Sequence, residues 1–242
     1  MEIPTQKVCQ IYPYVPDINI TSKYLQEKAN QDILKLLYIA QGRRFKSKGG
    51  LEVIEAFGKV RETMNVSLTI ISHYDLLTVD EIEKIRDFGI RFIEFNLPFS
   101  ELEKFYLEHH VLLQPSSDDS FGMTVLEAMK AGMALITSDM YAFKEMVENN
   151  KNGFLIEPSY RFFKEDNIPN PAVWNHRQRT LYSGKINNKL IDDIIDRITR
   201  LYRNRELLFE FMSCSLEKAA LMYSCDSIKN AWNKLFINDF YE

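Results

Sequence analysis

The chain has 242 residues, of which 45% are hydrophobic and 26% are charged, a balance that is typical of a folded globular protein and excludes a fibrous or disordered one. Its formal net charge of -4 argues against a broad binding surface for nucleic acid or anionic lipid, so any phosphate binding must be local. One large α/β domain with a C-terminal helical extension accounts for this length.

Three cysteines, Cys9, Cys214 and Cys225, have neither the spacing of a metal site nor the density of a disulfide framework. This cysteine usage fits a reducing compartment. No apolar run approaches the ~20 residues of a membrane span, and the N-terminus lacks the basic and apolar regions of a signal peptide. We therefore predict a cytoplasmic protein with no transmembrane segment.

The first 30 residues contain Pro4, Pro13 and Pro16 and little periodicity, so residues 1–30 are predicted to be a linker-like segment. Residues 31–242 are predicted to form one domain. In it, short apolar runs alternate with amphipathic stretches, which indicates βα units around a parallel sheet. Six strands are predicted, at 36–40, 67–71, 90–95, 111–114, 134–137 and 154–156.

Two helices between these strands have signals at their starts. Thr78 with Glu81, and Ser100 with Glu103, match the capping box, in which side chains satisfy backbone groups of the first turn. Two helical patterns stop at glycines that fit helix C-terminal caps, Gly89 and Gly132.

After the last strand, residues 158–185 form a polar, aromatic-bearing insertion in which Pro169 and Pro171 exclude a continuous helix. Residues 207–236 are predicted to be further helix. The helix before them has one apolar face, formed by Leu190, Ile194, Ile198 and Leu201.

The first segment with a chemical signal is residues 42–50, GRRFKSKGG, directly after the strand at 36–40. Glycine lets the backbone turn tightly, and two cations on one short loop clamp a diphosphate better than one does. The alternative is a solvated basic turn, because such loops are common on protein surfaces.

The second segment, residues 115–129, has the sequence PSSDDSFGMTVLEAM. Backbone amides at the start of its helix would favour a phosphate, and Glu127 could accept hydrogen bonds from ribose hydroxyls. Asp119 lies eight residues earlier, at most ~12 Å away along a helix, which suits the two ends of a nucleotide sugar better than an acid/base couple. In the alternative interpretation, Asp119 or Ser120 caps the helix and Glu127 is an exposed charge.

Several short motifs follow one another in a fixed order. They are Gly42-Arg43, Lys48-Gly49, Asp119 and Glu127 around Phe121-Gly122, the stretch 131–139, Glu145, and NGFL at 152–155. In this order they resemble the C-terminal domain of the retaining GT-B glycosyltransferases, the glycosyl transferases group 1, which include sucrose and glycogen synthases. The resemblance covers roughly residues 36–158 and implies one Rossmann-like, doubly wound parallel sheet of about six strands, half of a GT-B fold.

The resemblance further implies transfer of a glycosyl group from a nucleoside diphosphate sugar with retention. Through it, Arg43 and Lys48 are predicted to contact the donor diphosphate and Asp119 the sugar hydroxyls, which makes these three the catalytic residues. Glu127 is predicted to bind the ribose, and the backbone around the helix start the sugar and phosphate. The donor-binding residues are thus Gly42, Phe121, Gly122, Met123 and Glu127. GT-B enzymes generally use no Asp-x-Asp metal site, so neither a metal nor a cofactor is predicted.

The sequence departs from the family in three places and in one larger respect. Asp119 is one methylene shorter than the usual Glu, Tyr141-Ala142 replaces Gly-Gly, and Lys144 replaces Pro. Nothing before residue 36 can form the family's N-terminal acceptor-binding domain. We therefore predict a nucleotide-sugar substrate and a missing or separately encoded acceptor domain, or a homo-oligomer, and no nucleic-acid partner. The alternative function is a non-catalytic nucleotide-sugar-binding or partner-docking module.

Other residues that could suggest a site have simpler interpretations. His109 and His110 point to opposite faces of a strand, so packing is favoured over a shared site. His73 follows a strand but has no identifiable partner in the sequence. Trp174 and Tyr182 could stack on a sugar, although a packed surface excursion is favoured for the insertion.

Overall fold

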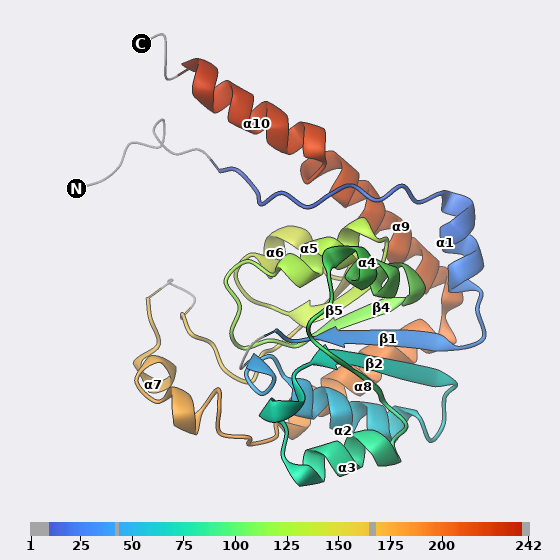
Figure 1. Cartoon of the computed structure of the whole chain (residues 1–242), viewed down its shortest axis with the longest axis vertical. Coiled ribbons are helices and arrows are strands. Elements are labelled where there is room, and N and C mark those ends of the chain that lie inside the picture. The colour runs from blue at the N-terminus through green and yellow to red at the C-terminus, as the bar shows by residue number, and fades with distance from the viewer. Residues whose placement is uncertain (1–9, 42–43, 165–167, 239–242) are drawn as a thin grey trace.

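The computed structural model describes residues 10–41, 44–164 and 168–238, and Figure 1 shows their arrangement. Six parallel strands form one sheet in the order β3-β2-β1-β4-β5-β6. All six predicted strands are present, with small shifts at their ends. The bounds of β1 to β6 are Leu34–Ile39, Val66–Ser72, Arg91–Glu94, Val111–Gln114, Ala134–Ser138 and Gly153–Ile156.

The strand order reverses between β1 and β4, which lie side by side inside the sheet. Leu36 pairs with Val111, and Leu37 with Leu112. From this pair the chain winds outward through β2 and β3 on one side and through β5 and β6 on the other. Open parallel sheets bind ligands at the carboxyl ends of strands where the order reverses, so the loops after β1 and β4 are the expected position of a ligand.

Helices cover both faces of the sheet (Figure 1). Along β1, Leu36 and Tyr38 belong to one buried apolar cluster and Leu37 and Ile39 to another, because alternate side chains of a strand point to opposite faces. The predicted doubly wound α/β class is therefore confirmed. The first cluster is covered by α2 (Gly50–Val60), α3 (Val79–Asp87) and α8 (Asn188–Arg203), and the second by α4 (Phe99–Glu108), α5 (Met123–Lys130) and α6 (Phe143–Met146).

Of the two predicted capping boxes, the structure confirms one. The backbone N–H of Thr78 donates to Glu81 over 2.8 Å, and that of Glu81 donates to the Thr78 hydroxyl over 3.3 Å. The box at Ser100 is wrong because α4 begins earlier: the carbonyl of Pro98 accepts from Leu102, so Ser100 already lies within the first turn. Both predicted C-terminal glycines have left-handed backbones, with φ of 68° and 61° at Gly89 and Gly132.

The C-terminal region is helical, as predicted for residues 207–236, and it forms two helices. The helix is interrupted between α9 (Arg205–Met222) and α10 (Cys225–Asn238). At this interruption the hydroxyl of Ser224 accepts a hydrogen bond from the backbone N–H of Ser227. In Figure 1, α10 projects away from the sheet. Among the residues that the structure describes, no helix combines the length and apolarity needed to cross a membrane. The predicted apolar face of α8 is buried.

The described residues of the insertion after β6 form only short helical pieces, as its prolines predict. Helix α7 (Pro171–Trp174) begins at a proline, with the Asn170 side chain accepting from Ala172, and a 3-10 turn follows at Arg177–Arg179. Figure 1 shows this segment standing off from the sheet.

The segment before β1 contains a helix that its weak periodicity did not predict. In α1 (Ser22–Ala29), the hydroxyl of Thr21 accepts from the backbone of Tyr24, and Leu25 and Ala29 are buried. An eight-residue helix has too few turns to show an apolar face clearly, and its stability comes from packing against the domain.

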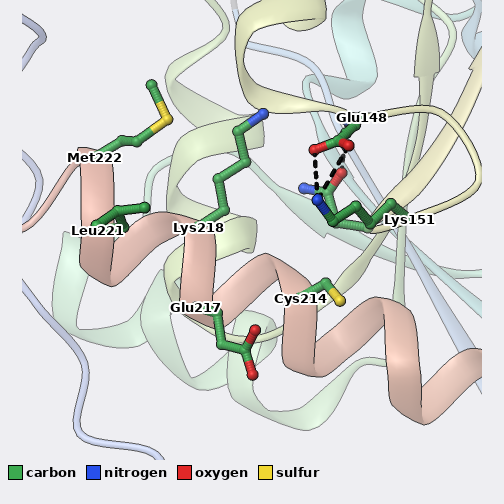
Figure 2. A pocket seen from close by; sticks show the side chains of 8 residues that line it. Glu148, Lys151, Cys214, Glu217, Lys218, Leu221 and Met222 are labelled. Atoms are coloured by element: carbon green, nitrogen blue, oxygen red, sulfur yellow. Dashed lines mark hydrogen bonds and ion pairs between the residues drawn. The ribbon is translucent and has the colours of Figure 1, made fainter.

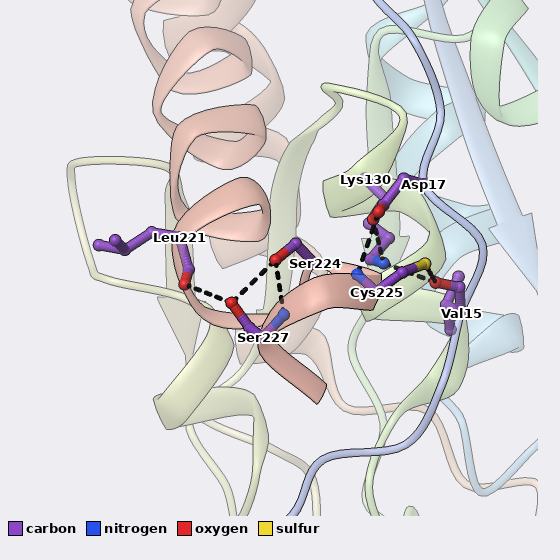
Figure 3. A network of polar contacts seen from close by, with 7 residues as sticks. All are labelled: Val15, Asp17, Lys130, Leu221, Ser224, Cys225 and Ser227. Carbon is purple, nitrogen blue, oxygen red and sulfur yellow. Dashed lines mark hydrogen bonds and ion pairs between the residues drawn. The ribbon is translucent and has the colours of Figure 1, made fainter. Parts of the chain in front are cut away.

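Figure 3 shows how the segment before α1 is fastened to the domain. Lys130, at the end of α5 and only 2% exposed, donates to the carbonyl of Val15 over 2.6 Å and to the Asp17 carboxylate over 2.7 Å. The other carboxylate oxygen of Asp17 accepts from the backbone of Cys225 at the start of α10. Burial raises the pKa of Asp17, but these hydrogen bonds outweigh burial and lower it overall. One carboxylate thus joins the N-terminal segment, α5 and α10.

Candidate functional site

The loops after β1 and β4 lie against each other at the carboxyl edge of the sheet. The backbone N–H of Ser117 donates to the carbonyl of Ser47 over 2.8 Å. A Cβ at Gly49 would lie 2.6 Å from the carbonyl oxygen of Pro115, and Gly49 has φ of 78°. Only glycine fits this approach, so the two predicted chemical segments are held together by their backbones.

Lys48 and Asp119 form an ion pair across these loops. The ammonium nitrogen lies 3.0 Å from a carboxylate oxygen, and the two side chains are only 10% and 9% exposed. The alternative of a solvated basic turn is therefore wrong for Lys48, although Arg44 in the same turn is exposed. Two of the three predicted catalytic residues are in direct contact. Gly42 and Arg43 lie outside the described residues.

The start of α5 has no side-chain cap. Its N-cap is Gly122, with φ of 90°, so the alternative in which Asp119 or Ser120 caps the helix is wrong. The first backbone N–H groups of a helix have no partner within it, and together with the helix dipole they favour an anion. Phe121 is half-buried and Met123 is exposed at this end of the helix.

Phe143 of α6 lies directly beneath Gly122. A Cβ at Gly122 would come within 2.2 Å of a ring carbon of Phe143, which is buried. The loop between β4 and α5 therefore depends on glycine both for its left-handed turn and for this close approach.

Glu127 lies one turn into α5 and is half-buried rather than an exposed helix charge. The hydroxyl of Tyr106, a fully buried residue of α4, donates to its carboxylate over 2.6 Å. Burial raises the pKa of Glu127, and the hydrogen bond from Tyr106 opposes that rise. Sequence reasoning missed Tyr106, since its place in the helical pattern indicates only a core residue.

The segment after β5, residues 139–145, contains the substitutions Tyr141-Ala142 and Lys144 that depart from the family pattern. Tyr141, which stands where Gly-Gly was expected, has a left-handed φ of 42°. Its hydroxyl accepts from the backbone of Phe163 over 3.1 Å. Glu145 accepts hydrogen bonds from Gln10 and Tyr12 of the N-terminal segment. This segment therefore connects the site to the insertion and to the N-terminal segment.

The histidines next to the strands have structural partners. His109 contacts Thr69 and the carbonyl of Phe105, and burial lowers its pKa to about 4. His110 bonds backbone groups of other segments, which confirms packing over a shared site. His73 pairs with Glu94 over 2.8 Å. The two residues meet because β2 and β3 are neighbours in the sheet. No group of three or more metal-ligating side chains occurs in the described part of the chain.

A separate hollow of about 260 Å³ lies between α9 and the turn before β6 (Figure 2). Lys151 pairs with Glu148 at its rim, and Cys214 lines its wall. Burial raises the pKa of Cys214, so the thiol stays protonated and unreactive at neutral pH. This hollow contains none of the predicted site residues.

A family model described as glycosyl transferases group 1 matches residues 25–162, more than half of the chain. The chain belongs to this family. It is 31% identical over 170 residues to an uncharacterized glycosyltransferase of Methanocaldococcus jannaschii, covering 64% of this chain and 42% of the relative. It is 27% identical over 133 residues to a sucrose synthase of Nitrosomonas europaea, covering 51% and 15%. This group 1 chain therefore spans less than half the length of either relative.

Solved structures share the fold. The C-terminal domain of a glycosyl transferase group 1 protein from Francisella tularensis has a TM-score of 0.62 at 19% identity, covering 87% of this chain and 96% of that domain. HepE of Anabaena, solved with UDP and glucose, has a TM-score of 0.66 at 14% identity, covering 94% and 56%. The group 1 chain thus has the architecture of one GT-B half, as the sequence predicts.

Proposed function

We propose that this chain is the donor-binding part of a retaining glycosyltransferase that uses a nucleoside diphosphate sugar. The observation that carries the proposal is the contact between Lys48 and Asp119 beside the uncapped start of α5. A cation, a carboxylate and backbone donors thereby converge at the carboxyl ends of β1 and β4. A sugar diphosphate needs these groups, because its phosphates require positive charge and its hydroxyls require acceptors.

In the proposed reaction, the bond between the anomeric carbon and the diphosphate oxygen breaks, and the diphosphate leaves with both electrons. Lys48, together with Arg43, stabilises the negative charge as it develops. The acceptor hydroxyl bonds to the carbon from the face that the diphosphate leaves, and its proton passes to the diphosphate. Because the same face is used, configuration is retained without a protein nucleophile.

The ion pair gives Asp119 a second role in this proposal. A bound diphosphate offers Lys48 another anionic partner, so Asp119 becomes available to accept hydrogen bonds from the sugar hydroxyls. Glu127, held by Tyr106, binds the ribose of the same donor. The donor would thus lie along the start of α5, from its sugar near Asp119 to its nucleoside near Glu127.

The acceptor would be held by a second domain. The chain spans 42% and 15% of the two relatives described above, so the acceptor side is proposed to lie in a domain other than this one. A GtfA/B complex is among the similar solved structures, with a TM-score of 0.61 at 19% identity.

The test is a thermal-shift panel of nucleoside diphosphates and their sugars, since a ligand that binds only the native state raises the melting temperature. The panel starts with UDP, UDP-glucose and UDP-GlcNAc, because HepE was solved with UDP and glucose, and pneumococcal GtfA with UDP and GlcNAc. We expect one diphosphate family to stabilise the protein and the matching monophosphate to do so less. Equal melting temperatures across the panel would contradict the donor site. Binding without transfer, even with an acceptor domain added, would support the non-catalytic alternative.

Tyr106→Phe should weaken ribonucleotide binding about three- to tenfold, because Glu127 loses the donor that orients it; a hydrogen bond to a charged group contributes about 1 kcal/mol or more. Removing that donor also raises the pKa of Glu127 further, so the loss should be larger at pH 6 than at pH 8. Calorimetric titration with the ribo- and 2'-deoxyribonucleotides at both pH values measures both effects. Tyr24→Phe, which removes a hydroxyl contact to the same helix, is the control. An equal loss of affinity for the ribo- and the 2'-deoxyribonucleotide would show that Tyr106 has only a structural role.

A further inference from the structure

The insertion after β6 is fastened beside the candidate site. The backbone N–H of Tyr160 donates to the hydroxyl of Ser117 over 3.0 Å. Further along, the hydroxyl of Tyr182 donates to the carboxylate of Asp118, which neighbours Asp119, over 3.4 Å. The insertion therefore lies next to the loop that carries the ion pair.

This segment is a packed platform rather than a loose loop. Phe162, Val173 and Leu181 form a small buried apolar cluster of their own. Trp174 packs on Phe162 with ring centres 5.3 Å apart, yet it remains 44% exposed. A large aromatic side chain is thus held rigidly at the surface.

Arg177 is stacked on these aromatic rings. Its guanidinium carbon lies 4.5 Å from the ring centre of Trp174 and 5.2 Å from that of Phe162. Stacking uses the face of the guanidinium and leaves its N–H edge available for a carboxylate, sulfate or phosphate. The exposed residues from Trp174 to Arg179 surround an open hollow of about 410 Å³. We refer to Trp174, Arg177 and Arg179 as the basic strip.

The charge of this region differs from that of the chain. The insertion, residues 158–185, contains three arginines and two lysines against one Glu and one Asp, a net charge of +3 within a chain of net charge -4. Burial and the charge of Asp118 raise the pKa of Tyr182, and the charges of Arg44 and Arg177 oppose that rise. The insertion thus carries positive charge on a chain that is acidic overall.

We propose that the basic strip binds an anionic glycan, a carbohydrate chain bearing carboxylate, sulfate or phosphate groups, and so adds a contact from this chain to an acceptor that the second domain holds. This inference rests on the proposed function. A glycan fits better than a nucleic acid, because one exposed tryptophan and two arginines offer neither successive stacking platforms nor a long basic groove. A stacked arginine beside an exposed aromatic ring matches a sugar ring and its charged substituent.

The test uses Trp174 as a reporter. The chain has two tryptophans, so Trp232→Phe leaves Trp174 as the only source of tryptophan fluorescence. A sulfated dextran oligosaccharide is the probe, and neutral dextran of equal length is its control. We expect a saturable change in emission with the sulfated probe alone, weakened at least fivefold by Arg177→Gln with Arg179→Gln. Lys23→Gln with Lys59→Gln removes the same charge from exposed sites on other helices and should leave the affinity unchanged.

Further variants distinguish glycan binding by the basic strip from a folding defect and from binding at the donor site. Arg179→Gln alone has no stacking contact to lose and should still weaken the probe about twofold. The double arginine variant should keep the nucleoside diphosphate affinity of the parent, and Lys48→Ala should keep its probe affinity. Unchanged probe affinity in the double variant, competition between probe and nucleotide, or equally tight binding of oligodeoxythymidine would each overturn the proposal. If the protein without these substitutions binds the probe but no nucleotide, the result would instead contradict the proposed function.

Discussion

Lys48→Ala should weaken nucleoside diphosphate binding at least tenfold, about 1.4 kcal/mol, and slow glycosyl transfer about 10²- to 10³-fold. The reason is that Lys48 is a buried cation in the loop after β1, paired with Asp119 just before α5, where the leaving diphosphate of the proposed reaction would gain negative charge. Calorimetric titration measures the affinity, and single-turnover transfer with an acceptor domain measures the rate.

The same substitution leaves Asp119 buried without its cation, which should destabilise the fold by roughly 3 kcal/mol. Lys48→Ala with Asp119→Ala should recover part of that stability in urea unfolding but none of the nucleotide affinity. Lys59→Ala, at the far end of α2, is the matched control because its side chain is exposed. A folded Lys48→Ala variant with affinity within twofold of the parent would eliminate the phosphate clamp.

Gly122→Ala should destabilise the protein by about 3 kcal/mol or more and lower nucleotide affinity with it. The left-handed backbone at φ of 90° costs an alanine about 1–2 kcal/mol. The added methyl group would also lie 2.2 Å from the Phe143 ring, so the loop or the ring must move. Urea unfolding gives the stability, and titration gives the affinity.

Gly89→Ala separates these two causes. Gly89 has φ of 68° but nothing within 4 Å of the added methyl group, so only the backbone strain applies, about 1–2 kcal/mol. Phe143→Leu in the Gly122→Ala background should restore part of the loss by making room. If the two alanine variants lose the same stability, Phe143 does not constrain the loop.

The strands were predictable because strands buried on both faces are short apolar runs, and all six were found. The boundaries of helices were less predictable, because they depend on packing. Ser100 matches a capping box by spacing, yet the helix starts at Phe99 because Pro98 supplies the first carbonyl. Helix α1 was missed because its stability comes from burying Leu25 and Ala29 against the rest of the domain.

In the candidate site, too, some residues could be predicted from the sequence and others could not. The cationic turn and the acidic helix start are local patterns, so their residues could be named from the sequence. Tyr106 could not, since a tyrosine in a helix is usually core and its contact with Glu127 joins two helices. The role of the insertion was also hidden, because Trp174 and Arg177 form a surface only after Phe162 packs beneath them.

The sequence by itself determined the α/β class and the number of strands, and it supplied the residues that are proposed to bind a sugar diphosphate, because these follow from apolar periodicity and short motifs. The tertiary structure decided which of those residues meet. Lys48 contacts Asp119 because β1 and β4 are neighbours at the reversal of strand order, a pairing between segments far apart in the chain. Such long-range pairing depends on how all the strands and helices pack together, which no local pattern specifies.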